Sequence, residues 1–154
     1  MRKDFREIMD DDCRAELARC IPSTRFNILV KCWDLQRCSK KVRSGHCGEH
    51  TEVMRYCIES PTFKTLLHEC RARVEELWQE QDRVTVLCVC SHGIHRSVAA
   101  SSALQCIYQM EGYTSKGACH LDHQYWRHLC SACSHCKPNK DKHTMFESFV
   151  VDAF

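Results

Sequence analysis

The sequence predicts an α/β domain in which a mainly parallel sheet is flanked by helices. Three observations lead to this prediction: two short apolar runs, helical periodicity between them, and an apolar helix directly after the second run. A strand that feeds a helix and then a second parallel strand is the repeating unit of such sheets. We expect this domain to span residues 23–123. An amphipathic helix at 1–22 would precede it, and a small cysteine-rich staple at 124–154 would follow it.

The first half of the domain contains one expected strand, one loop and two helices. Residues 26–32 (F-N-I-L-V-K-C) are typical of a strand, and a polar, cationic loop follows at 36–47. A helix is expected at 49–59. A second helix begins at Ser60-Pro61, where a serine N-cap precedes a proline in the first turn. Apolar residues then recur at three- and four-residue steps, which predicts a long helix packed on the core.

The second half begins with the continuous apolar run at 84–90, which is typical of a strand buried on both faces. Residues 97–111 predict a buried helix that ends at Gly112, since glycine often follows the last helical residue. A short strand is expected around 113–120. The alternation of strands and helices completes the α/β prediction.

The composition limits the class of protein. The chain has 154 residues and a net charge of +2, too balanced to favour a nucleic-acid binder on charge alone. No apolar run approaches the roughly 18 residues of a membrane span. The charged start, M-R-K-D-F-R, lacks the apolar core of a secretory signal. We therefore expect a cytoplasmic or nuclear protein that is not secreted and has no membrane partner. Most of its 14 cysteines fall in apolar patterns typical of buried thiols.

The turn after the second strand, V-C-S-H-G-I-H-R-S-V, is the most informative stretch. Ligands of parallel sheets bind at the carboxyl ends of strands, and the N–H groups at the start of a helix attract anions. Gly93 lets successive amides point inward, and the planar fork of Arg96 suits phosphate. A thiol at Cys90 would be largely thiolate here. The predicted ligand-binding residues are Cys90, Ser91, His92, Gly93, His95, Arg96 and Ser97.

The same turn reads Cys-x5-Arg-Ser, which resembles the loop of cysteine-dependent phosphatases. In that resemblance Cys90 would be the nucleophile, Arg96 would clamp the transition state, and Ser97 would stabilise the leaving thiolate. Such an enzyme also needs a general acid. Asp34, which follows the first strand, is the candidate. A cysteine-dependent phosphatase is therefore the alternative function.

A second resemblance covers residues 26–123. The run G-I-H-R-S-V-A after the cysteine, the upstream helix S-P-T-F-K-T-L-L and the downstream pair Gly112-Tyr113 resemble the C-terminal domain of the bacterial RNase adapter protein RapZ. The resemblance implies a stand-alone domain that binds a phosphosugar or another small phosphorylated metabolite at the Cys90 turn. It also implies a regulatory role linked to RNA or to a protein partner. No cofactor is implied for the pocket.

The cysteine-rich end predicts a separate metal site. Cys130, Cys133 and Cys136 form two overlapping Cys-x2-Cys pairs, a spacing that suits tetrahedral zinc. We expect His123 to be the fourth ligand and the zinc to have a structural role. The alternatives for the fourth ligand are His120 and Cys119. Free thiols and an iron–sulfur cluster are alternatives to zinc, and a zinc-stapled interaction module without a small ligand is a third functional hypothesis.

Overall fold

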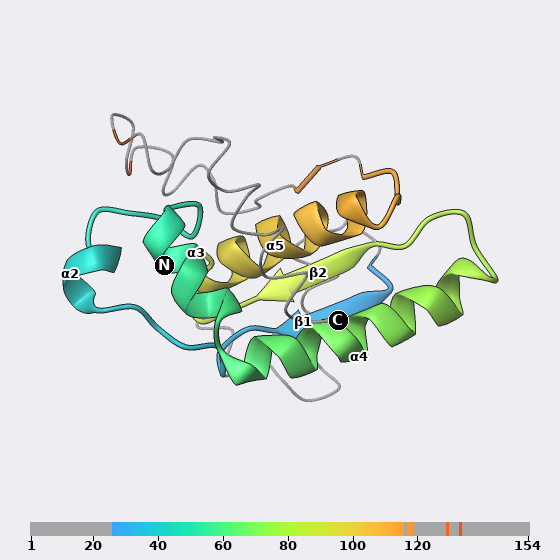
Figure 1. The fold of residues 1–154 in the computed structure, drawn as a ribbon, viewed down its shortest axis with the longest axis horizontal. Helices are drawn as coiled ribbons and strands as arrows, with labels where there is room; N and C mark the ends of the chain where they lie inside the picture. The colour runs from blue at the N-terminus through green and yellow to red at the C-terminus, as the bar shows by residue number, and fades with distance from the viewer. Residues whose placement is uncertain (1–25, 116, 119–128, 130–132, 134–154) are drawn as a thin grey trace.

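The computed structural model of the chain confirms the α/β class (Figure 1). It describes residues 26–115, 117–118, 129 and 133. The elements, in order, are β1 (Ile28–Lys31), α2 (Lys40–Arg43), α3 (Thr51–Ile58), α4 (Pro61–Trp78), β2 (Val86–Val89) and α5 (Arg96–Met110). The expected N-terminal helix at 1–22 and nearly all of the cysteine-rich tail lie outside the described residues.

The two strands form a parallel pair in which Ile28 is aligned with Val86 and Lys31 with Val89. The side chain of Asn27 fixes one end of this pair, because its Oδ1 accepts from the backbone N–H of Thr85 at 2.7 Å. In Figure 1, α4 runs beside β1 and α5 runs beside β2. α3 and α4 make the connection from β1 to β2. The carboxyl ends of both strands therefore meet at one edge of the sheet, where the turn after β2 begins.

α2 is a short helix inside the loop for which the sequence predicts no regular structure. Ser39 caps it, since its hydroxyl accepts from the backbone N–H of Val42 at 3.3 Å. Four residues without apolar periodicity give no helical signal, which is why the sequence does not reveal it. The prediction of a strand around 113–120 is wrong for the described residues of that range, because none of them lies in a strand. Instead, the Tyr113 ring packs edge-on against Trp78, with ring centroids 5.4 Å apart.

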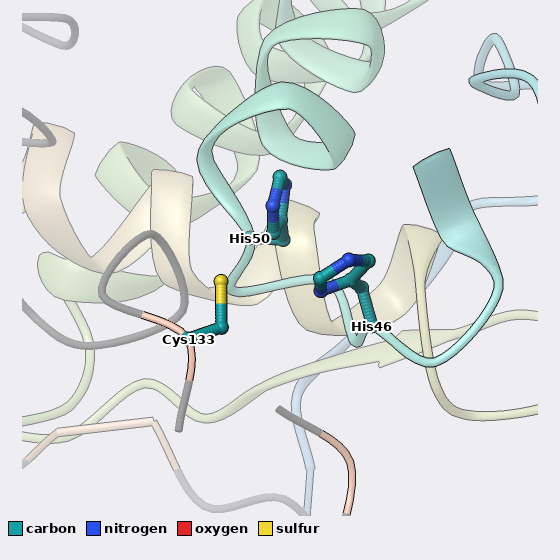
Figure 2. Close-up of side chains that lie close together, drawn as sticks. All are labelled: His46, His50 and Cys133. Atoms are coloured by element: carbon teal, nitrogen blue, oxygen red, sulfur yellow. The ribbon is translucent and has the colours of Figure 1, made fainter. Parts of the chain in front are cut away.

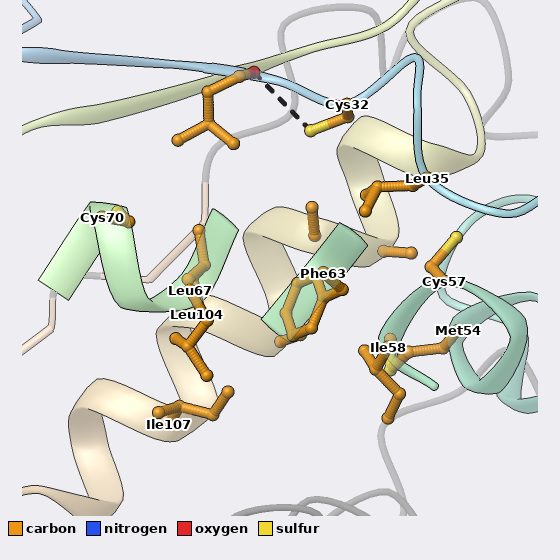
Figure 3. Close-up of a cluster of buried hydrophobic side chains, with 14 of the residues drawn as sticks. Cys32, Leu35, Met54, Cys57, Ile58, Phe63, Leu67, Cys70, Leu104 and Ile107 are labelled. Atoms are coloured by element: carbon orange, nitrogen blue, oxygen red, sulfur yellow. Dashed lines mark hydrogen bonds between the residues drawn. The ribbon is translucent and has the colours of Figure 1, made fainter. Parts of the chain in front are cut away.

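The core lies between the sheet and α3, α4 and α5 (Figure 3). Phe63 and Leu67 of α4 meet Leu104 and Ile107 of α5, and each of these side chains is at most 3% exposed. Burying one such side chain contributes about 1.5–3 kcal/mol to the free energy of unfolding. This packing holds the start of α5 in place beside the end of β2.

The cysteines of this core act as small apolar residues, as expected. The nine cysteines in the described residues all carry free thiols. Burial raises the pKa of Cys70 to about 11, so this thiol is neutral at physiological pH. The pKa of Cys32 is also raised well above its ordinary value, by the hydrogen bond with Cys88 and by burial.

Candidate anion-binding site

The turn between β2 and α5 places Cys90 directly after the strand and Arg96 at the first position of the helix. Gly93 has a φ of 62°, in the left-handed region that glycine adopts without a steric penalty. This conformation lets the turn curl around the sulfur of Cys90. The geometry agrees with the sequence expectation of a tight, ligand-facing turn at the carboxyl end of a strand.

The thiol of Cys90 is surrounded by hydrogen-bond donors. It is only 4% exposed, and its Sγ lies 3.2 Å from the Oγ of Ser97. Burial alone would raise the pKa of Cys90. However, hydrogen bonds from the Ser97 hydroxyl and from the backbone N–H groups of Ser97, His92 and Gly93 outweigh burial, so the pKa is lowered. Donors that converge in this way stabilise negative charge, whether it is on the sulfur or on a bound anion.

Arg96 supplies a buried positive charge at the same turn. It is 6% exposed, and its two terminal nitrogens donate to the backbone oxygen of Leu35 and to the Oγ of Ser91, each at 3.4 Å. Both bonds are long for N–H···O contacts. Burial and the nearby Arg37 lower the pKa of Arg96, but an arginine remains protonated near neutral pH. No carboxylate among the described residues pairs with it, so its charge is available to an anion.

His95 ties the turn to α2. Its Nε2–H donates to the backbone oxygen of Arg43 at 3.2 Å, because a carbonyl oxygen can only accept. Burial lowers the pKa of His95, although the backbone oxygens of Arg43 and His46 act in the opposite direction. The neutral ring therefore acts as a fixed donor at neutral pH. His92, in contrast, is exposed to solvent.

A cavity of about 50 Å³ lies beside this turn. A space of this size holds a few water molecules or a small anionic group. Its lining residues are Gln36, Arg37, Cys38, Arg43, Val53, Cys57, Cys90, His92, His95 and Arg96.

The polar, cationic loop at 36–47 has two interpretations from the sequence: an ordinary solvated loop, or a positively charged lid over the anion pocket. The structure places Arg37 and Arg43 of this loop in the cavity wall.

The predicted ligand-binding residues divide into two groups. Cys90, His92, His95 and Arg96 line the cavity. The second group does not line the cavity but supports it. Ser91 accepts a hydrogen bond from Arg96, Gly93 shapes the backbone of the turn, and Ser97 contacts the sulfur of Cys90. Asp34, the candidate general acid, is exposed and is not part of the lining. No carboxylate within the described part of the chain lines the cavity.

Gly48 supports the site in a way that the sequence does not reveal. Its backbone N–H donates to the backbone oxygen of Ile94 at 2.8 Å. A Cβ atom at this position would lie 2.6 Å from the backbone nitrogen of Ala99 and would also clash with the backbone oxygen of His95. The loop before α3 thus packs backbone to backbone on the first turn of α5. Only the tertiary structure shows this contact, because the glycine is remote in sequence from α5.

Of the four predicted metal ligands, the structure describes Cys133 alone; Cys130, Cys136 and His123 lie outside the described residues. Cys133 lies beside His46 and His50, and Figure 2 shows these three side chains pointing toward one another. Their potential ligand atoms are all within 4.8 Å of one another. We call them the His46–His50–Cys133 cluster.

Comparison of the chain with protein-family models, curated proteins and solved structures found no match. The functional argument therefore depends on the geometry of the site itself. No helix in the part of the chain that the structure describes is long and apolar enough to cross a membrane.

Proposed function

We propose that this chain binds a small phosphorylated metabolite at the Cys90–Ser97 turn. The observation that carries the proposal is that backbone N–H groups converge on the Cys90 sulfur, and that this sulfur and the buried Arg96 guanidinium line one cavity. Helix N-termini with such amides bind phosphate groups in many folds. Within the described residues, Arg96 donates two long hydrogen bonds to neutral oxygens, which phosphate oxygens would replace with shorter, charge-assisted ones.

The remaining lining residues favour an organic phosphate over a bare ion. Arg37 and Arg43 add positive charge to the cavity wall, while Val53 and Cys57 of α3 add apolar surface. A sugar attached to the phosphate would contact this mixed wall. The resemblance to the RapZ C-terminal domain supports a phosphosugar. It also supports a regulatory role linked to RNA or a protein partner, which we include in the proposal.

Calorimetric titration of the full chain tests this proposal. The ligands are a hexosamine phosphate, inorganic phosphate and the corresponding hexosamine without phosphate. We expect the two phosphates to bind and the hexosamine without phosphate not to bind. Arg96→Gln should weaken binding by at least about tenfold, because it removes a charged, buried hydrogen-bonding group. Arg83→Gln is the matched control, since Arg83 is exposed and does not line the cavity.

Two outcomes would overturn the binding proposal. The first is equal affinity for the hexosamine and the hexosamine phosphate, because the phosphate would then contribute nothing. The second is unchanged phosphate affinity in Arg96→Gln, because the ion would then bind elsewhere. Circular dichroism of both arginine variants shows whether their folds are intact.

A cysteine-dependent phosphatase is the second candidate function, and the lowered pKa of Cys90 favours it. In this reaction the Cys90 thiolate would attack phosphorus, and the bond from phosphorus to the leaving oxygen would break as that oxygen takes up a proton from solvent water. Water would then hydrolyse the phosphocysteine and release phosphate. Ser97, which contacts the sulfur, would stabilise the thiolate as it leaves.

Hydrolysis of an aryl phosphate under reducing conditions distinguishes the two functions. Turnover by the wild type that is lost in Cys90→Ser would establish the phosphatase. No turnover between about pH 5 and 8, the range in which common general acids and bases titrate, would leave the binding function alone. Cys106→Ser serves as the control, because Cys106 lies on α5 outside the cavity lining.

A further inference from the structure

We propose that His46, His50 and Cys133 bind a structural zinc ion. Two imidazoles and one thiolate are ligands that zinc prefers. Zinc bonds of about 2.0–2.3 Å place tetrahedral ligand atoms roughly 3.5 Å apart. The potential ligand atoms of the cluster already lie within 4.8 Å of one another, so small side-chain shifts would bring them to coordinating distance. The rings of His46 and His50 lie with their centroids 4.2 Å apart and their planes tilted by 52°.

The cluster joins two segments that are far apart in sequence. His46 lies in the loop between α2 and α3, and His50 is the N-cap residue of α3. Cys133 packs against a small apolar group formed by Cys47, Ile94 and Val98. This packing directs the thiol toward the two histidines, as Figure 2 shows. A metal ion here would fasten the cysteine-rich end to the loop that packs on α5.

The sequence around Cys133 supports the same proposal independently. Cys133 is the central member of the Cys-x2-Cys-x2-Cys run, whose spacing is typical of metal-binding knuckles. In this proposal His46 and His50 supply two imidazoles, in place of His123, the single histidine ligand that the sequence favoured. The outer cysteines of the run, Cys130 and Cys136, are the sequence-based candidates for the fourth ligand.

Metal binding should compete with the cap of α3. The Nδ1 atom of His50 accepts from the backbone N–H of Glu52 at 3.3 Å. A neutral imidazole has one nitrogen lone pair available in the ring plane, so it cannot accept this bond and bind a metal ion at the same time. If Nδ1 binds zinc, the ion replaces the hydrogen bond; if Nε2 binds zinc, Nδ1 carries the proton and cannot accept. Zinc loading should therefore release the Glu52 amide.

The test is metal analysis of the full chain, purified without a histidine tag under reducing conditions. We expect about one zinc per chain, as in other closed structural sites. His46→Gln and Cys133→Ser should each lose it. His68→Gln and Cys106→Ser, which alter a histidine and a cysteine outside the cluster, should retain it. On removal of zinc, the NMR signal of the Glu52 amide should shift, and its hydrogen exchange should slow.

Cobalt substitution and one conservative variant keep the proposal testable if a ligand variant fails to fold. Cobalt in the wild-type chain should show the visible bands of a tetrahedral site and a near-ultraviolet thiolate band. His46→Cys should keep the metal and strengthen the thiolate band, because it adds a second sulfur. A chain without bound zinc would overturn the proposal. Zinc retained in His46→Gln, or a thiolate band unchanged in His46→Cys, would overturn it as well, since the metal would then lie elsewhere.

Discussion

Cys90 and Cys57 line the same cavity, but their surroundings shift their pKa values in opposite directions. Burial raises the pKa of Cys57 to about 12, and its thiol donates to the backbone oxygen of Gln36 at 3.7 Å. Burial acts on Cys90 too, but the Ser97 hydroxyl and the amides of the turn more than compensate for it. The position of the donors, and not the residue type, thus decides which of the two thiols loses its proton more readily.

Alkylation at increasing pH tests this difference. We expect the rate of Cys90 modification by iodoacetamide to rise with a midpoint below that of a free cysteine, because the thiolate is the reactive form. Cys57 should stay unmodified near neutral pH. Ser97→Ala should move the Cys90 midpoint upward, since it removes the closest donor. Peptide mass spectrometry measures both sites in one sample, and equal midpoints for Cys90 in wild type and Ser97→Ala would contradict the prediction.

His95 should make stability depend on pH. Burial lowers its pKa below the ordinary 6.5 that it has in the unfolded chain, so the unfolded state binds more protons between the two values. The free energy of unfolding should therefore fall as the pH falls through 6.5 toward the folded pKa. Urea unfolding at a series of pH values measures this slope. His95→Asn should reduce the slope and His68→Asn should not; identical slopes in all three proteins would refute the prediction.

The elements differ in how well the sequence predicts them. The strand and helix expectations for β1, β2, α3, α4 and α5 are confirmed with boundaries shifted by a few residues, because long periodic or apolar runs specify these elements locally. α2 has no such run. Tyr113 has the β-propensity of a strand residue, but its ring packs on Trp78 and Tyr108 instead. Tertiary packing of this kind overrides local propensity and is not visible in a sequence.

The contact between Gly48 and α5 gives a prediction at the level of elements. Gly48→Ala should lower the free energy of unfolding by about 1–3 kcal/mol, because a Cβ would push the loop away from the backbone of α5. It should also weaken phosphate binding, since the same helix turn carries Arg96. Gly45→Ala is the comparison. Among the described residues no atom lies within 4 Å of a Cβ added at Gly45, so the expected cost of this substitution comes from the positive φ of 77°. Denaturant unfolding of both variants measures the costs, and an equal or smaller cost for Gly48→Ala would contradict the contact.

At the scale of the molecule, the candidate site combines residues that are close in sequence with residues that only the fold brings together. Cys90, His95 and Arg96 lie within one continuous turn, so the sequence alone identifies them. The rest of the cavity wall comes from the loop at 36–47 and from α3. These segments lie next to the turn only because the chain folds around the β1–β2 pair. The spacing of residues along the chain does not predict that these segments lie next to the turn. The proximity of Cys133 to two histidines is a product of the fold for the same reason.

Because three separate parts of the chain form the cavity, a ligand bound there should stabilise the whole domain. A ligand that binds only the folded state adds about 2.7 kcal/mol to the free energy of unfolding at a concentration 100 times its Kd. We therefore expect the hexosamine phosphate to raise the melting temperature of the wild-type chain. Arg96→Gln should show no rise at the same concentration, and Arg83→Gln should respond like the wild type.

Scanning calorimetry of the three proteins measures this stabilisation. It should appear with and without bound zinc, because the metal cluster and the cavity share no side chain. A melting temperature that rises equally in Arg96→Gln would show that the ligand stabilises the chain from another surface. A rise that requires zinc would show that the segment at 36–47 must be fastened before the cavity can hold the phosphate, since His46 of the cluster and Arg43 of the lining both belong to it.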